Sequence, residues 1–315
     1  MARQIADTSE HTLPKIAIAR HQTFHLRDNW LPKGLRALAH DPLALSSVDG
    51  HHHLGVGKNM LTSIRYWVQA TGLAVPGERR IGGRVPLYWT ELAKLVLRYD
   101  PFLEDMATLW LLHLGLASNV GLATFWYWAF NEYDEVQFGE DDLATGFIDY
   151  VCSKGHPVPN ERSVRKDINV FLRTYRRSRS ASNRVMEDTL DCPLAGLSLV
   201  EDVRGAKPFA FSIGPKSNLA LELVAYTTFQ YRRQARPRAE FISLDELRWA
   251  AHGPGRLLLL DSRALMEAME GIEARTHGAW LRVSYTAGLR NVHLGDVAPL
   301  GVLTSYYDGG HDGTD

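Results

Sequence analysis

Hydrophobic and polar positions between residues 54 and 71 recur with a helical period. Steps of about 100° per residue from Gly57 gather the apolar side chains on one side of a helix: Met60, Leu61, Ile64, Trp67 and Val68. The other side gathers Lys58, Thr62, Arg65, Tyr66 and Gln69, with Asn59 in the same first turn. Cations for phosphates and polar groups for base edges are what a helix in a nucleic-acid groove carries. The alternative is a solvated helix face that happens to hold cations.

The glycines before this helix invite comparison with a nucleotide-binding P-loop. That motif requires a glycine five positions before Gly57 and Ser or Thr after Lys58, and this chain has His52 and Asn59 there. The spacing therefore argues against nucleotide binding, and we expect neither a nucleotide nor a redox cofactor. The free N–H groups of the helix start favour a bound phosphate instead.

The flanking pattern predicts a helix–helix–hairpin unit. Residues 29–40 read as a helix with Asp28 or Asn29 as N-cap, and an alternating segment, 80–88, surrounds a Gly82-Gly83 turn. Thr90 is expected to cap a helix that runs to about Arg98, and residues 23–27 read as a short extended segment. This order is that of a winged helix, with the helix at 58–71 in the recognition position.

The pattern returns twice along the chain. In the second unit, an apolar stripe along 160–175 faces a polar stripe at i, i+4, i+7 and i+11: Arg162, Lys166, Asn169 and Arg173. Strands near 197–200 and 209–213 supply its wing. The third unit has helices at 244–251 and 262–274 and a hairpin at 280–294, and its acidic helix face suits a structural or partner-facing role. The aromatic segment 103–150 favours a core over a base-stacking surface.

These elements predict a mainly α protein with short β-hairpins, of the α+β class, built from tandem winged-helix-like units. We place an N-terminal unit at 1–100, a helical segment with the second unit at 101–215, and the third unit at 216–315. The first 20 residues and those after Tyr307 read as poorly ordered. Three consecutive histidines, 51–53, read as a polar loop.

Charge matters through its distribution, because the net charge is −1. Residues 160–184 carry a local net charge of +6, and four arginines cluster at 232–238. This segregation predicts one electropositive face. The longest apolar run, 106–117, is too short to span a bilayer, so we expect a cytoplasmic protein without membrane contact.

No established nuclease signature is present. No lysine follows an Asp or Glu by two positions, and there is no His-x-Lys pair. The residues placed before the key helix are His25, Arg27 and Lys33. We assign His25 as general base or metal ligand, and Arg27 and Lys33 as groups that stabilise charge on phosphorus. The alternative is that the two cations are structural or position a phosphate. The expected cofactor is a divalent metal, Mg or Mn, and the sequence does not identify its ligands.

Several blocks resemble a bacterial family of unknown-function domains found beside DNA phosphorothioation genes. They are RDNWLPKG at 27–34, LGVGKNM at 54–60, SIRYW at 63–67, DPFLED at 100–105, LWLLH at 109–113, Asp167 with FLRTY at 171–175, PLAGL at 193–197 and TAGLR at 286–290. The resemblance covers nearly the whole chain.

The resemblance implies a nickase that acts on double-stranded DNA in phosphorothioation and phage defence. It also implies partners: a cysteine desulfurase, an ATPase and a protein similar to PAPS reductase. The competing expectation from the residues is a non-catalytic DNA-binding adaptor or transcriptional regulator. The oligomeric state stays open, with a homodimer as one candidate.

Overall fold

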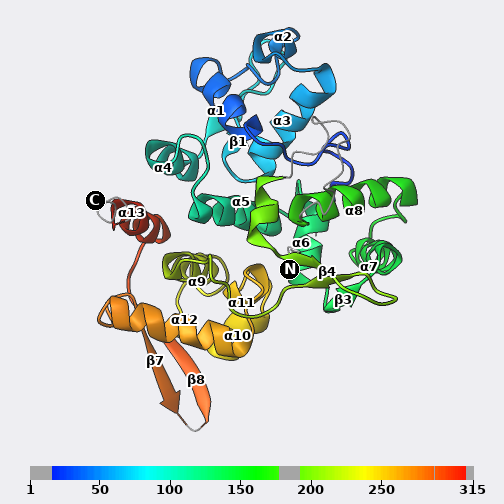
Figure 1. Ribbon diagram of the computed structural model, residues 1–315. Helices are drawn as coiled ribbons and strands as arrows, with labels where there is room; N and C mark the ends of the chain where they lie inside the picture. Colours follow the sequence, from blue (N-terminus) through cyan, green and yellow to red (C-terminus); the bar gives the residue numbers. More distant parts are fainter. Residues whose placement is uncertain (1–15, 177–191, 287, 310–315) are drawn as a thin grey trace, which may run out of the picture.

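The computed structural model describes residues 16–176, 192–286 and 288–309. The expectation for the first 15 residues and the part of the basic segment after residue 176 lie outside this range. The N-terminal elements run in the order α1 (Trp30–His40), α2 (Gly50–Leu54), α3 (Lys58–Ala70), β1 (Ala74–Pro76), β2 (Leu87–Trp89) and α4 (Glu91–Tyr99). Figure 1 shows α1, α2 and α3 together at one end of the molecule.

The predicted N-terminal helices are confirmed. Thr90 caps α4, because its side-chain oxygen accepts a hydrogen bond from the Ala93 N–H at 3.1 Å. The Gly82-Gly83 turn is present, but the paired strands β1 and β2 lie farther out than the sequence indicated. Asn29 precedes α1 in a left-handed conformation and makes no side-chain cap. The segment 24–27 forms no strand.

The central part of the chain surrounds a buried helix. Its elements are α5 (Met106–Ser118), α6 (Thr124–Asn131), β3 (Gln137–Phe138), α7 (Glu140–Ser153), α8 (Glu161–Tyr175), the 3-10 helix η1 (Pro193–Leu197), β4 (Val200–Asp202) and β5 (Phe209–Phe211). α5 is apolar on nearly all sides and is buried accordingly. Phe125, Trp126, Trp128 and Phe130 of α6 are also buried, which confirms that they form core.

The C-terminal part repeats the alternation of helices with a small sheet. Its elements are α9 (Leu221–Ala235), β6 (Phe241–Ser243), α10 (Leu244–Trp249), α11 (Pro254–Leu257), α12 (Ser262–Arg275), β7 (Leu281–Thr286), β8 (Leu289–Leu294) and α13 (Pro299–Gly309). The acidic face of α12 is structural in part, since Glu273 accepts from the Val283 N–H and Glu270 from the Tyr285 hydroxyl. α13 extends past Tyr307, where the sequence suggested disorder.

The central and C-terminal parts share one topology. In each, a strand is followed by helices and then by two strands, and the first strand pairs antiparallel with the last one. The sheet orders are β3-β5-β4 and β6-β8-β7, whereas the N-terminal sheet has two strands. Helices with small antiparallel sheets confirm the predicted α+β class.

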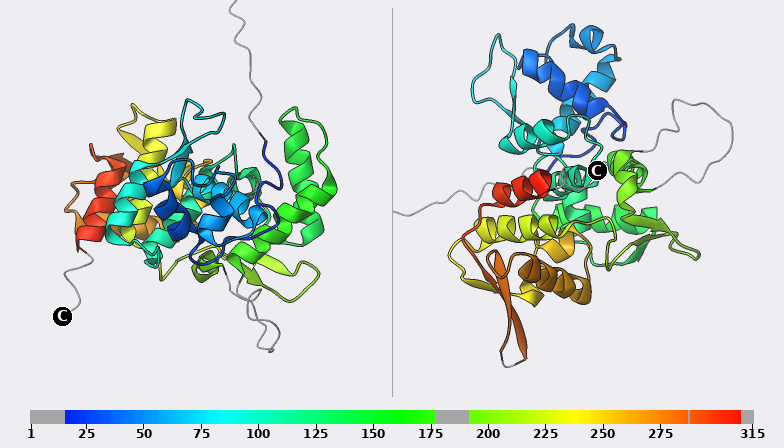
Figure 2. Two further views of the ribbon diagram at one scale, coloured as in Figure 1. Left: turned by 90° about the horizontal axis from the view of Figure 1, so that it is seen from above. Right: turned by 60° about the vertical axis from the view of Figure 1, so that its left-hand side comes forward.

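One cluster of buried apolar side chains extends from Leu26 to Leu303 and includes all three predicted units. Close helix contacts depend on glycine: a Cβ at Gly115 in α5 would lie 2.1 Å from the Thr71 carbonyl oxygen after α3. α13 packs against α9 and α4, so the C-terminal segment returns to the N-terminal one (Figure 2). The unit boundaries at 100 and 215 therefore stay predictions. None of the helices in the described ranges is long and apolar enough to cross a membrane.

Candidate nucleic-acid interface

The outer face of α8 is an exposed cationic surface. The helix begins where the Asn160 side-chain oxygen accepts a hydrogen bond from the Ser163 N–H at 3.3 Å. Its inner stripe is buried: Val164, Ile168, Phe171, Leu172 and Tyr175. Its outer stripe is exposed over three turns: Arg162, Lys166, Asn169 and Arg173. Within the described ranges, these four side chains have no hydrogen bond or ion pair with another side chain.

Two acidic groups beside α8 are already paired with a cation outside the stripe. Arg165 forms ion pairs with Glu161 at 2.7 Å and with Asp141 at 2.9 Å. Arg165 therefore offsets part of the negative charge of these carboxylates. The three cations of the stripe stay available for an anionic partner, as the sequence predicted.

Two buried contacts hold the inner side of α8. Asp167, only 2% exposed, lies 2.6 Å from the His21 Nε2 and also accepts from the Ala19 N–H. The Thr23 N–H donates to His21 Nδ1, which leaves the ring proton on Nε2, facing the carboxylate. Burial raises the pKa of Asp167, against the opposing effect of His21. Ser63 of α3 donates to the His21 carbonyl at 3.1 Å, so α3 and α8 lie on either side of this segment (Figure 1).

The start of α3 is exposed as predicted. Lys58, Asn59 and Thr62 face solvent, and Gly57 at the N-cap position leaves the first turn without a side-chain cap. Free N–H groups beside a lysine suit a phosphate oxygen. The start of α3 is therefore accessible to a phosphate group, in line with the prediction.

The rest of the predicted outer face of α3 is occupied by internal contacts. The half-buried Arg65 donates to the Ser46 hydroxyl and to the Val85 carbonyl oxygen, and burial lowers its pKa. The Gln69 amide donates to the Arg65 carbonyl oxygen at 2.8 Å. Arg65 therefore holds α3 against the loop before α2 and the segment before β2, and neither side chain is directed at a partner.

The prediction that Tyr66 lies on the outer face is wrong. Tyr66 is 6% exposed, and burial raises its pKa well above the usual value. Its ring meets that of His21 edge to face, with centroids 5.9 Å apart. The helical period left this side of α3 free, but the chain segment before α1 covers it.

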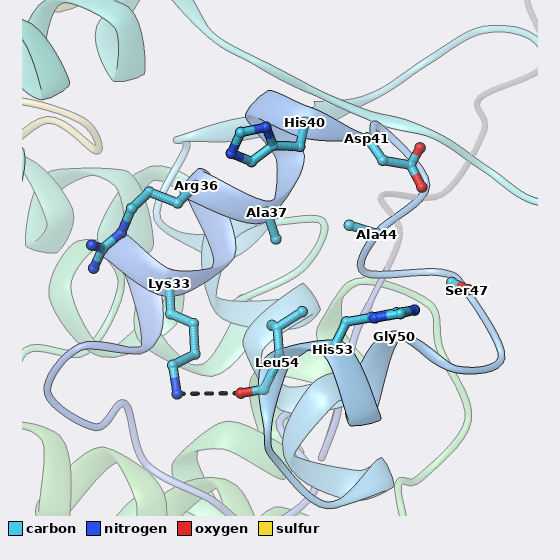
Figure 3. A pocket seen from close by; sticks show the side chains of 10 residues that line it. All are labelled: Lys33, Arg36, Ala37, His40, Asp41, Ala44, Ser47, Gly50, His53 and Leu54. Atoms are coloured by element: carbon cyan, nitrogen blue, oxygen red, sulfur yellow. Dashed lines mark hydrogen bonds between the residues drawn. The ribbon is translucent and has the colours of Figure 1, made fainter.

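A basic pocket opens beside these elements, between α1, α2 and the loop that joins them. Its volume is about 460 Å³, and its lining includes Lys33, His40 and His53. Figure 3 shows Lys33 extending toward the end of α2, where its ammonium donates to the Leu54 carbonyl oxygen at 3.3 Å. Asp41 is the carboxylate in this lining. A pocket of this composition suits a small anion such as a phosphate group.

The three predicted catalytic residues do not share one location. Lys33 lines the pocket, whereas His25 is 5% exposed and packs in the interior. The Arg27 guanidinium lies 5.4 Å from the Phe24 ring centroid and 5.5 Å from that of Trp30. His25 as a solvent-accessible base is therefore contradicted by its burial, and Arg27 has an aromatic environment that fits the structural alternative.

His40 and His53 were not among the predicted site residues. Positions 33, 36, 37 and 40 share one face of α1, and this spacing was visible in the sequence. His53 was missed because the histidine run was read as a loop, whereas it forms α2. A basic stripe on a predicted helix beside a histidine run was the available signal.

The residues do not fit a dedicated metal cage. Within the described ranges, no group of three or more His, Cys, Asp or Glu side chains is arranged to hold a metal ion. The Asp41 carboxylate of the pocket already accepts from the Leu43 N–H at 2.8 Å. Magnesium sites use one or two carboxylates with waters and substrate phosphates. A magnesium ion in this pocket would therefore take most of its ligands from water and from a substrate phosphate.

The comparisons with known proteins agree with the resemblance in the sequence. A family model described as a protein of unknown function, DUF4007, matches residues 18–307, and this chain belongs to that family. It is similar in structure to SspB. A magnesium-ion-bound SspB crystal structure aligns with a TM-score of 0.83, and a second SspB crystal structure aligns with 0.82. Each is 30% identical and covers 93% of this chain and 88% of the SspB chain. No curated protein matches significantly.

Proposed function

We propose that this protein binds double-stranded DNA through the outer face of α8, with the start of α3 adding a phosphate contact. The observation that carries the proposal is the stripe of three cations and one amide on α8 that other side chains leave unpaired. Lysine and arginine neutralise phosphates, and an asparagine can read an adenine edge. The strand–helices–hairpin order of the central and C-terminal parts supports winged-helix-like units around these helices.

Salt dependence tests this interface. Replacing Arg162, Lys166 and Arg173 with Ala should lower affinity for all sequences and reduce the slope of log K against log salt by about 0.9 per lost phosphate contact. A matched control replaces three paired surface cations outside α8, Arg263, Arg275 and Lys94, because it removes the same charge elsewhere. Equal slopes in the two triple variants would refute the interface.

We infer that the protein acts in the Ssp system as a DNA nickase, together with the cysteine desulfurase, the ATPase and the PAPS-reductase-like protein of phosphorothioation. The similarity to SspB over nearly the whole chain supports a role in that system. The basic pocket supports the catalytic part. Lys33 would stabilise charge that develops on a phosphate, and His53 or His40 would act as general base.

Supercoiled plasmid tests nicking directly. The protein with Mg or Mn should convert the plasmid to open circle, and EDTA should stop the reaction if the metal is required. His53→Gln should lower the rate several hundredfold at unchanged DNA affinity, because a general base contributes about 10²–10⁴. His52→Gln is the matched control, since His52 is exposed on the same helix but does not line the pocket. Equal rates in the two variants would exclude His53 as the general base, and an unchanged rate in His40→Gln as well would remove the pocket from the mechanism.

The second candidate is a non-catalytic adaptor or regulator that places partner proteins on DNA. The repeated strand–helices–hairpin order favours it, because tandem DNA-binding units need no active site. Plasmid binding without relaxation, with Mg or Mn present, would select this candidate over the nickase.

A further inference from the structure

A second cavity lies where the N-terminal, central and C-terminal parts of the chain meet. It has a volume of about 260 Å³ and is enclosed by α5, α9, the end of α3 and the α10–α11 connection. The backbone walls come close here because Gly115 of α5 touches Thr71. The cavity is separate from the basic pocket between α1 and α2, since the two share no lining residue.

The lining contains no Lys, Arg, Asp or Glu. One side is apolar, with Leu111 and Leu114 of α5, and the α9 side carries the phenol rings of Tyr226 and Tyr231. Apolar walls with a few placed polar groups are typical of small-ligand sites. A ligand for this cavity is therefore uncharged, because a buried charge without a counter-ion is costly.

Two buried polar atoms in the lining have no hydrogen-bond partner among the described residues: Gln230 Oε1 and His252 Nδ1. The Gln230 Nε2 donates to the Tyr226 hydroxyl at 3.0 Å. Turning the amide by 180° would swap its oxygen and nitrogen, but one of the two atoms would still have no partner. Burial lowers the pKa of His252, so its imidazole is neutral near pH 7. A buried polar atom without a partner destabilises the fold, and a ligand that pairs both atoms would remove that cost.

We propose that this cavity binds a neutral planar heterocycle of nucleobase size, whose polar edge pairs with Gln230 and His252. The volume is slightly below the roughly 300–1,000 Å³ of sites for drug-sized ligands, which suits one or two fused rings. A nucleobase presents donors and acceptors side by side on one edge, as two unpaired groups require. Its faces would lie against the leucine and tyrosine walls.

Such a ring has two sources: a free nucleoside, or a base extruded from duplex DNA. The free-nucleoside arm titrates the full-length protein with each of the four deoxynucleosides by NMR. At least one should bind saturably, and Gln230→Leu should weaken it at least tenfold, about 1.4 kcal/mol. Gln137→Leu on β3 is the matched control, because this glutamine is exposed and does not line the cavity.

Thermal unfolding separates a lost ligand contact from a damaged fold. Gln230→Leu removes the unpaired amide oxygen but also the hydrogen bond to the Tyr226 hydroxyl, so its Tm is compared in the background of Tyr226→Phe, which already lacks that bond. The double variant should be as stable as Tyr226→Phe or more stable. A lower Tm for the double variant would mean that the amide oxygen is already satisfied, and would overturn the proposal. Nucleoside binding that Gln230→Leu leaves unchanged would also overturn it.

The DNA arm uses a duplex with 2-aminopurine, whose fluorescence rises when the base leaves the stack. A rise with the unaltered protein that disappears with Gln230→Leu assigns the cavity to an extruded base. Nucleoside binding without this rise assigns it to a free ligand. Failure of both arms means that water alone fills the cavity and overturns the proposal. The nucleoside arm requires neither DNA binding nor nicking, so its result is independent of the proposed function.

Discussion

The two helices predicted as equivalent recognition elements, α3 and α8, differ in what covers them. Both have a buried apolar stripe, and both carry an exposed cation in the first turn, Lys58 in α3 and Arg162 in α8. On α8 the opposite stripe stays open, whereas on α3 the segment around His21 covers Tyr66 and Arg65 is bonded to Ser46. The helical period therefore identifies the side of a helix that faces the core. It does not show whether another segment of the chain packs against the opposite side.

The same comparison explains what fixes α8 in place. Its inner side makes two polar contacts in the core, Asp167 with His21 and Tyr175 with His113. Buried polar groups of this kind are satisfied only in one arrangement of their partners. α8 can therefore present a rigid outer stripe, and changes to its inner side should act on stability before they act on DNA binding.

The largest effect is expected from Asp167→Ala. Removing the carboxylate leaves the buried His21 Nε2 and the Ala19 N–H without a partner, which should lower the free energy of unfolding by about 3–5 kcal/mol. Urea unfolding measures this loss. Asp149→Ala on α7 is the control, because Asp149 is exposed and its loss should change stability by about 0.5 kcal/mol or less. Equal midpoints for the two variants would show that the buried pair does not anchor α8.

The next effect is a pH dependence that originates at His113. Its Nδ1 accepts from the Tyr175 hydroxyl at 2.8 Å, and its Nε2 donates to the Leu257 carbonyl at 2.7 Å, so the ring joins α5, α8 and α11. Burial lowers the pKa of His113 from 6.5 to about 4. Between these values the unfolded chain binds more protons than the folded one.

The sign of the pH effect follows from that difference. The free energy of unfolding should have its full value above about pH 6.5, where His113 is neutral in both states. It should fall by about 3 kcal/mol as the pH drops to 4, and should change little from this group at lower pH. Denaturant unfolding between pH 7 and pH 4 measures the slope. His113→Gln should be less stable at pH 7. Its free energy of unfolding should also depend less steeply on pH, because the titrating imidazole is absent. An unchanged slope in that variant would assign the pH dependence to other groups.

Much of the fold was accessible from local signals. The ranges of α1, α3, α4, α8 and α12 followed from periodicity and caps, because one apolar face and an N-cap define a helix from residues only a few turns apart. The two strands β3 and β6 were missed. Each is only two or three residues long and is defined by pairing with a distant strand, which local sequence does not encode.

The candidate interface was predictable only in part. The stripe on α8 follows from a local spacing, whereas the basic pocket depends on how α1 and α2 meet. Gly50 permits this meeting, since a Cβ there would lie 2.3 Å from the Ala44 carbonyl oxygen. The burial of Tyr66 also depends on long-range packing around His21 and Asp167. A sequence pattern cannot supply contacts between residues more than 100 positions apart.

A smaller effect compares the two amide side chains that could read bases. Asn169 of α8 is exposed, whereas the Gln69 amide is bonded to its own helix backbone. If α8 reads a base edge, Asn169→Ala should reduce discrimination at one base position by about 1–3 kcal/mol, and Gln69→Ala should leave the preference unchanged. Binding selection from a randomised duplex library measures both. A changed preference in Gln69→Ala alone would restore α3 as the reading helix.

The smallest effect separates an exposed cation of α3 from an engaged one. Lys58 stands at the open helix start, so Lys58→Ala should lower the salt slope by about one unit, roughly a fourfold change in affinity between 50 and 200 mM salt. Arg65→Ala removes the same charge but should leave the slope unchanged, because its guanidinium is held by Ser46 and Val85. It should instead destabilise the fold by about 1–3 kcal/mol, since those hydrogen bonds are lost. A fall in slope for Arg65→Ala without loss of stability would mean that DNA binding draws this side chain out of its contacts, and α3 would then resemble α8 in the complex.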